Sequence, residues 1–185
     1  MVRKYVAFDE TDEAFDRFLS DFQGETDRAA AVLGAAFIDD LLEALLCAIA
    51  VDEDVMRGDL LGMSHPLSTL SARIDAAFCF ALVTQAERRD MHFVRKIRNA
   101  FAHLATPLSF DDAPVRDWCR EFGCNRERFQ ALPAFAEEYS QQPRKLFDLA
   151  VALLAHGLVR RLRSTRRVEE AQPLPMAGRA SEERS

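Results

Sequence analysis

The chain has 185 residues, of which 49% are hydrophobic, so it is long enough to form one domain with a sizeable core. Its 14 phenylalanines, against 1 tryptophan and 2 tyrosines, predict a core rich in phenylalanine. The formal net charge of −6 excludes a protein that binds polyanions over its whole surface, so any nucleic-acid interface would have to be a local basic patch.

The cysteines and the apolar segments indicate the cellular compartment of the protein. Cys119 and Cys124 have C-x4-C spacing and no second Cys or His pair, so we expect reduced thiols and no metal site. The N-terminal segment turns acidic at once and lacks the apolar core of a signal peptide. The longest apolar stretch, residues 29–51, is interrupted by carboxylates and is too polar to span a membrane. We therefore expect a cytoplasmic protein with no membrane partner.

The first part of the chain is predicted to be helical, because its apolar residues recur at helical spacing and strand-like alternation is absent. A first helix is expected over residues 11–22 and a long second helix over residues 27–51. Asp39 and Asp40 lie within this second helix, where they mark either a solvated polar face or a buried polar notch. Residues 52–66 contain glycines and a proline and are predicted to form a loop with room for one short turn.

Two helices are predicted in the middle of the chain. The first covers residues 68–82. Thr84, with Glu87 three residues later, forms a capping box that begins the second. This helix must end before Thr106-Pro107, because a residue that precedes proline disfavours helical geometry.

The last part of the chain is predicted to hold two more helices. Asp111-Asp112 is expected to cap a short helix that ends near residue 122, with Gly123 as its stop signal. A loop-like region follows, and a last helix is predicted over residues 142–163.

The predicted fold is therefore all-α, a single bundle of five to six helices in residues 1–163. From residue 164 onward the chain is polar, with prolines and mixed charges, and residues 164–185 are predicted to be a disordered tail.

The run Ile97–His103 is the strongest candidate for chemistry, because it puts Arg98, Asn99 and His103 on the last turns of a helix. Asn99 and His103 are four residues apart and share a face. A helix C-terminus favours the imidazolium form of His103, which suits a general acid or base near neutral pH. Arg98 can hold a phosphate through its planar guanidinium. Together these roles suit cleavage of an RNA phosphodiester without a metal ion.

A structural role explains the same residues. Arg98 and His103 are five residues apart, about 140° around an ideal helix, so they converge only if the last turn unwinds. In this interpretation Arg98 pairs with Asp39 or Asp40, and His103 caps carbonyl groups at the helix end. The residue types alone favour this structural role over a catalytic one.

The remaining candidates are charged residues. Arg95 and Lys96 belong to a basic cluster on the motif helix, which is either a solvated face or a groove that tracks phosphates. Asp39 and Asp40 are either solvated or paired with Arg73 or Arg98. No glycine-rich phosphate loop and no closely spaced histidine pair is present, so we expect no cofactor and no metal ligands.

The spacing Arg98-Asn99-x3-His103 resembles the signature of HEPN domains. The resemblance implies a small all-α bundle with the motif near a helix end, paired with a second copy about a two-fold axis. Many HEPN domains are metal-independent RNases whose active site forms from both subunits. Others have no activity and serve as scaffolds or regulatory modules.

A longer stretch, between residues 27 and 122, is similar to the mannitol-operon repressor family. The segments that carry this resemblance are Asp27–Leu33, Leu67–Ile74, Ile97–His103 and Leu108–Asp112. The resemblance implies transcriptional regulation, yet the sequence contains no helix-turn-helix with a basic recognition helix. It therefore implies action through a protein partner or an RNA.

Two functional hypotheses follow. The first is a homodimeric interaction module in which Arg98, Asn99 and His103 shape a seam or a partner site; the net acidity and the absence of a binding fingerprint favour it. We prefer this hypothesis because the catalytic signature persists in many inactive HEPN-like proteins. The second is a metal-independent endoribonuclease in which Arg98 and His103 are the catalytic pair and Asn99 orients them. The intact motif and the basic cluster on the motif helix favour the second.

Overall fold

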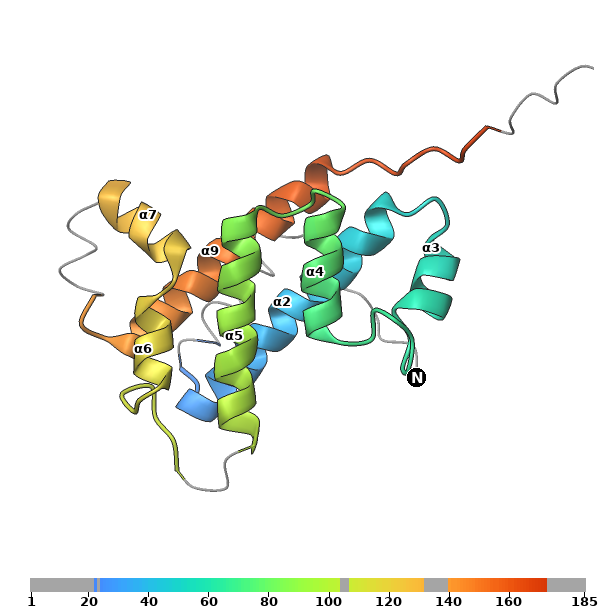
Figure 1. The fold of residues 1–185 in the computed structure, drawn as a ribbon. Helices are drawn as coiled ribbons and strands as arrows, with labels where there is room; N and C mark the ends of the chain where they lie inside the picture. Colours follow the sequence, from blue (N-terminus) through green and yellow to red (C-terminus); the bar gives the residue numbers. More distant parts are fainter. Residues whose placement is uncertain (1–21, 23, 104–106, 132–139, 173–185) are drawn as a thin grey trace, which may run out of the picture.

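The structure is a computed structural model that describes residues 22, 24–103, 107–131 and 140–172. Within these ranges the chain is helical and contains no strand, which confirms the all-α prediction. The elements, labelled as in Figure 1, are α2 (Asp27–Ile49), α3 (Glu53–Val55), the π-helical turn η2 (Met56–Leu60), α4 (Leu70–Cys79), α5 (Gln85–His103), α6 (Val115–Arg120), α7 (Gly123–Ala131) and α9 (Pro143–Ser164).

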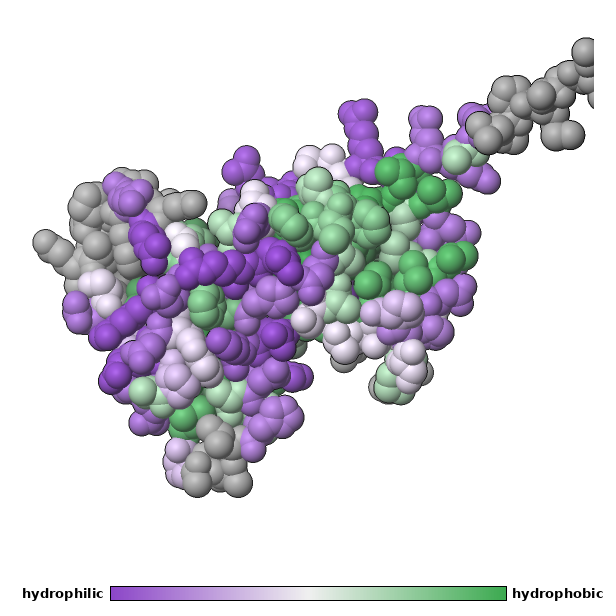
Figure 2. Space-filling view, in the orientation of Figure 1, coloured by the Kyte–Doolittle hydropathy of each residue, from purple (hydrophilic) through white to green (hydrophobic). Residues whose placement is uncertain are grey.

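Two long helices, α2 and α9, form the centre of the bundle and pack against each other (Figure 1). They approach closely at Gly34, where an added Cβ would lie 3.1 Å from Val151 Cγ2. Helix α5 packs against α2 and lies beside α4, while α6 and α7 sit at one end of the bundle and α3 at the other. The face that α5 turns outward is largely hydrophilic (Figure 2).

The core is rich in phenylalanine, as the composition predicts. Five phenylalanines are at most 1% exposed, namely Phe22, Phe101, Phe110, Phe122 and Phe147. The ring of Phe147, on α9, lies 5.0 Å from that of Phe110 and 6.2 Å from that of Phe22, measured between centroids. Such tilted ring pairs add to the stabilisation from apolar burial, and here they join α9 to the segment before α2 and the segment after α5.

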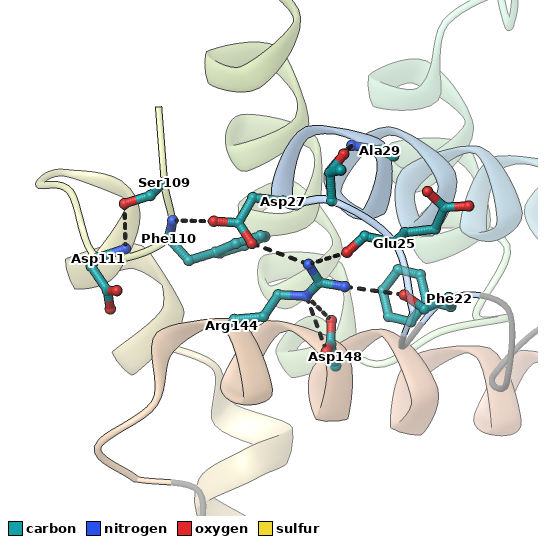
Figure 3. A network of polar contacts seen from close by, with 10 residues as sticks. Phe22, Glu25, Asp27, Ala29, Ser109, Phe110, Asp111, Arg144 and Asp148 are labelled. Atoms are coloured by element: carbon teal, nitrogen blue, oxygen red, sulfur yellow. Dashed lines mark hydrogen bonds and ion pairs between the residues drawn. The ribbon is translucent and has the colours of Figure 1, made fainter. Parts of the chain in front are cut away.

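One arginine joins three separate parts of the chain (Figure 3). On α9, the Nε of Arg144 donates to Asp148 at 2.8 Å, and its Nη1 lies 3.1 Å from Asp27 Oδ1 at the start of α2. Its Nη2 donates to the carbonyl of Phe22 at 3.0 Å. The other oxygen of Asp27 accepts the backbone N–H of Phe110. Burial raises the pKa of Asp148 to about 6, although the neighbouring Arg144 opposes this shift.

The predicted start of α5 is confirmed by its hydrogen bonds. The hydroxyl of Thr84 accepts the backbone N–H of Glu87 at 3.2 Å, and Glu87 accepts the N–H of Thr84 at 2.8 Å. Glu87 also binds both terminal nitrogens of Arg161 on α9. Burial opposes its ionisation, but these hydrogen bonds outweigh burial and hold the pKa of Glu87 below its ordinary value.

The prediction that Gly123 stops a helix is wrong, because Gly123 is the first residue of α7. The cause is Asp90, a buried carboxylate on α5 that accepts the backbone N–H groups of Gly123 at 3.0 Å and Cys124 at 2.8 Å. A side chain from another helix thus satisfies the free N–H groups at the start of α7. The region predicted to be a loop after Gly123 is therefore partly helical.

Two other boundaries differ from the predictions. The predicted loop over residues 52–66 contains α3 and η2, and Asp52 caps α3 by accepting the N–H of Val55. The short helix predicted from Asp111-Asp112 begins at Val115, because Asp112 instead accepts the N–H of Ser109 and closes a turn. Most of the predicted helix over residues 11–22 and the tail beyond residue 172 lie outside the described residues.

Substitution of Arg144 tests its role in the bundle. We expect Arg144→Gln to lower the free energy of unfolding by about 3 kcal/mol, because Asp27 and Asp148 would lose their cationic partner in a mostly buried site. Arg160→Gln, an exposed arginine on the same helix, is the control and should change the free energy by less than about 0.5 kcal/mol. Urea unfolding followed by circular dichroism measures both. Equal midpoints for the two variants would contradict the role of Arg144.

Candidate functional site

A cavity of about 660 Å³ lies between α2, the start of α4 and α5. It collects five of the residues singled out from the sequence, namely Asp39, Asp40, Arg95, Arg98 and Asn99. Arg95, Arg98 and Asn99 reach it together because residues three and four apart share one face of a helix. We treat this cavity as the candidate site because it brings these residues together.

The motif residues do not all meet in this cavity. Arg98 and Asn99 line it, and Arg98 Nη1 donates to Asn99 Oδ1 at 3.0 Å. His103, the last residue of α5, is exposed and is not among the lining residues. The helix stays regular through His103, so the five-residue spacing keeps the imidazole and the guanidinium on different faces. The structure therefore brings together Arg98 and Asn99 but not the Arg98–His103 pair.

The predicted ion pair between Arg98 and Asp39 or Asp40 is not formed. Within the described residues no carboxylate lies within ion-pair distance of Arg98, whose side chain is exposed. The same holds for Arg95 across the described ranges, and its Nε is buried without a hydrogen-bond partner there. Neither guanidinium thus forms an ion pair within the described residues, although the carboxylates of Asp39 and Asp40 line the same cavity. Both arginines are therefore able to pair with an acidic group of a partner.

Asp39 pairs with Arg73 instead. The Nη1 of Arg73, on α4, lies 2.9 Å from Asp39 Oδ1, and its Nη2 lies 3.1 Å from Glu43 Oε2. The side chain of Arg73 is 9% exposed, and it also donates to the carbonyls of Leu67 and Leu61. Asp39 and Glu43 therefore form a partly buried polar notch on α2, in which they pair with the nearly buried Arg73. Asp40 is exposed at the edge of the cavity.

The basic cluster on α5 divides into two parts. Near its start, Arg88 pairs with Asp75 at 2.7 Å and Arg89 with Glu121 at 2.8 Å. Burial opposes ionisation of Asp75, but hydrogen bonds from Arg88 and His92 outweigh it and lower the pKa. Nearer its end, the ammonium of Lys96 lies 4.9 Å from the ring centroid of Trp118. The cations that stay available for a partner are thus Arg95, Lys96 and Arg98.

The start of α4 contributes to the site in a way that sequence reasoning missed. Ser68, Thr69 and Ser71 line the cavity opposite α5, and the hydroxyl of Thr69 caps α4 by accepting the N–H of Ala72. A Ser-Thr pair before an apolar helical run is a start signal that predicts the cap. Only the packing of α4 beside α5 brings these residues to the same cavity as the arginines.

Other candidate chemistry is not assembled in the described residues. Among them no group of three or more His, Cys, Asp and Glu side chains is placed to hold a metal ion. All four cysteines are free, and burial raises the pKa of the Cys119 and Cys124 thiols. None of the described helices is long and apolar enough to cross a membrane.

Comparison with known proteins identifies a solved structure with a similar fold. No family model matches the chain, and no curated protein sequence matches it. Among solved structures, it is similar to a chain of the "X-ray structure of the MtlR-HPr complex from Escherichia coli", with a TM-score of 0.59 and 20% sequence identity. The similarity covers 79% of this chain and 99% of that chain. The two proteins thus share an all-α fold over nearly the whole of the matched chain, which agrees with the resemblance to mannitol-operon regulators at the level of the fold.

A charge reversal tests the polar notch. We expect Asp39→Lys to lower the free energy of unfolding by about 2 kcal/mol, because it places a second cation beside the nearly buried guanidinium of Arg73. The control is Asp59→Lys, since Asp59 is exposed on η2 and no ion pair involves it within the described residues. Thermal unfolding of the three proteins measures the effect, and a melting temperature of Asp39→Lys equal to that of the control would argue against a buried pair.

Proposed function

We propose that this protein is a regulatory interaction module that acts by binding a protein partner and has no DNA-binding helix-turn-helix of its own. The observation that carries the proposal is the fold that it shares with a chain of the MtlR–HPr complex. In that complex the two named proteins are bound to each other. A shared fold does not fix a function, so the proposal also depends on the surface around the cavity.

The docking surface that we propose is the α5 side of the cavity. Arg98 is exposed there, Arg95 and Asn99 are half-buried, and Asn99 accepts a hydrogen bond from Arg98. Lys96 is exposed on the same helix beside Trp118, outside the residues that line the cavity. Because Arg95 and Arg98 form no ion pair within the described residues, an acidic patch on a partner protein would complement this surface. Charged rims of this kind steer association and select partners.

Binding to HPr tests this proposal. We expect the full-length chain to bind HPr from Escherichia coli in isothermal titration calorimetry, and the double variant Lys96→Glu/Arg98→Glu to bind at least about tenfold more weakly, a loss of 1.4 kcal/mol or more. Arg160→Glu, an exposed charge reversal on α9, is the matched control and should leave the affinity unchanged. Equal loss in both variants would show a nonspecific charge effect, and absence of binding by the wild type would remove HPr as the partner.

The second candidate is a metal-independent endoribonuclease. One observation favours it, because Arg98 and His103 are both exposed near the same end of α5 and Arg98 has no carboxylate partner in the described part of the chain. His103 lies outside the cavity, so a composite site would need the His103 of a second copy. We accordingly propose that catalysis, if it occurs, requires a homodimer, whose formation light scattering measures.

Cleavage of RNA separates the two candidates. The interaction module predicts that a mixed-sequence RNA stays intact with purified wild type in EDTA. The endoribonuclease predicts cleavage by the wild type and its loss in Arg98→Ala and His103→Ala, both of which replace exposed side chains and should fold normally. His156→Ala, an exposed histidine on α9, is the control for a contaminating activity. Cleavage that all of these variants retain would come from a contaminant.

A further inference from the structure

A second hollow lies at the α3 end of the bundle and differs in chemistry from the cavity at Arg98. It is an apolar groove of about 490 Å³ between the end of α2, α3, η2 and the residue after α4. Figure 2 shows hydrophobic residues gathered at this end, beside the start of the C-terminal segment. Three large apolar side chains at the groove stay open to solvent, with Val51 45%, Val55 49% and Phe80 54% exposed. Clustered exposed apolar residues of this kind mark interaction surfaces.

The chain itself occupies the edge of this groove. Residues 165–172 follow α9 without helical structure, and the backbone N–H of Val168 donates to the carbonyl of Ile49 at 2.9 Å. Ile49 is the last residue of α2, so its carbonyl has no partner within the helix. The side chain of Val168 lines the groove. One backbone hydrogen bond and one apolar residue thus hold an extended segment against the end of α2.

The charges around the groove are opposite in sign to those of the segment. Asp52 lines the groove, and Glu53 and Asp54 follow it on α3 and form its acidic rim; all three are exposed. Glu53 also pairs with Arg57 at 2.7 Å. The seated segment brings Arg166 and Arg167 directly before Val168, and Arg167 Nη2 lies 3.8 Å from Glu53 Oε2. An apolar floor with an acidic rim therefore accommodates an apolar residue that follows basic ones.

The geometry of the contact between residues 167–168 and the groove indicates that this contact is weak. Val168 stays 54% exposed while it lines the groove, and the Arg167–Glu53 pair is long and solvent-exposed. Exposed ion pairs contribute little and are screened by salt. The tether raises the effective concentration of Val168 and so favours the intramolecular contact. A partner segment displaces it only by filling the groove more completely.

We propose that this groove is a docking site for an extended segment of a protein partner in which an apolar residue follows arginines or lysines, and that the chain's own Arg166–Val168 is its intramolecular competitor. The partner segment donates a backbone N–H to the Ile49 carbonyl, places its apolar side chain against Val55 and Phe80, and sets its cations against the rim. This surface is separate from the cavity at Arg98. Binding at the groove can therefore hold or fail independently of HPr binding at α5.

A peptide that copies the segment tests the proposal on the full-length chain. The probe is a fluorescein-labelled peptide with the sequence of residues 163–172, and binding is followed by fluorescence polarisation. The wild type keeps its own segment in the groove, whereas Val168→Asp removes the apolar anchor from that segment. We expect the Val168→Asp chain to bind the peptide at least about tenfold more tightly than the wild type, a gain of 1.4 kcal/mol or more. A peptide with Asp in place of its valine should not bind.

A second substitution assigns the binding to the groove. Val55→Asp, added to Val168→Asp, puts a charge on the apolar floor at a half-exposed position, and circular dichroism confirms that the fold is kept. We expect this chain to lose peptide binding, and Glu53→Lys in the same background to weaken it at low salt. Three results would overturn the proposal: no binding to the Val168→Asp chain, equal affinity of this chain and the wild type, or binding that survives Val55→Asp.

Discussion

The guanidinium of Arg144 is the interaction on which the rest of the structure depends. It fixes the first turn of α2 to α9 through Asp27, and Asp27 in turn holds the segment after α5 through the N–H of Phe110 (Figure 3). The rings of Phe22 and Phe110 lie 5.7 Å and 5.5 Å from this guanidinium, measured to their centroids, so it is also covered by the aromatic core. Because α2 carries the wall of the cavity opposite α5, the position of its first turn determines where the cavity forms.

Local signals were sufficient to predict most of the helices. Thr84 and Glu87 are close in sequence, and their capping box marks the start of α5. Long-range contacts explain the errors. Gly123 is a stop signal by local rules, but Asp90 satisfies the N–H groups of a new helix there from another element. The contacts of Arg144 with the start of α2 are likewise invisible in the sequence, because their partners are more than a hundred residues away.

The distinction between local signals and long-range contacts also applies to the candidate site. Helical spacing places Arg95, Arg98 and Asn99 on one face, and the structure puts all three at one cavity. Spacing alone did not decide which arginine would pair with the carboxylates of α2, and Arg73 rather than Arg98 does so. As a result, Arg98 stays available at the surface while Asp39 stabilises the contact between α2 and α4. A positive surface next to a polar cavity, and His103 outside it, fit a binding role better than a catalytic site within one chain.

The central claim is that the α5 side of the cavity binds an acidic protein surface. Chemical-shift mapping of the ¹⁵N-labelled full-length protein tests it most directly, with parallel titrations of HPr from Escherichia coli and of a 2′-O-methyl RNA that cannot be cleaved through its 2′-hydroxyl. The account predicts that HPr shifts the backbone signals of α5 around Lys96, Arg98 and Asn99, and that the RNA leaves them in place. Shifts centred on Arg98 and His103 with the RNA, and none with HPr, would contradict it.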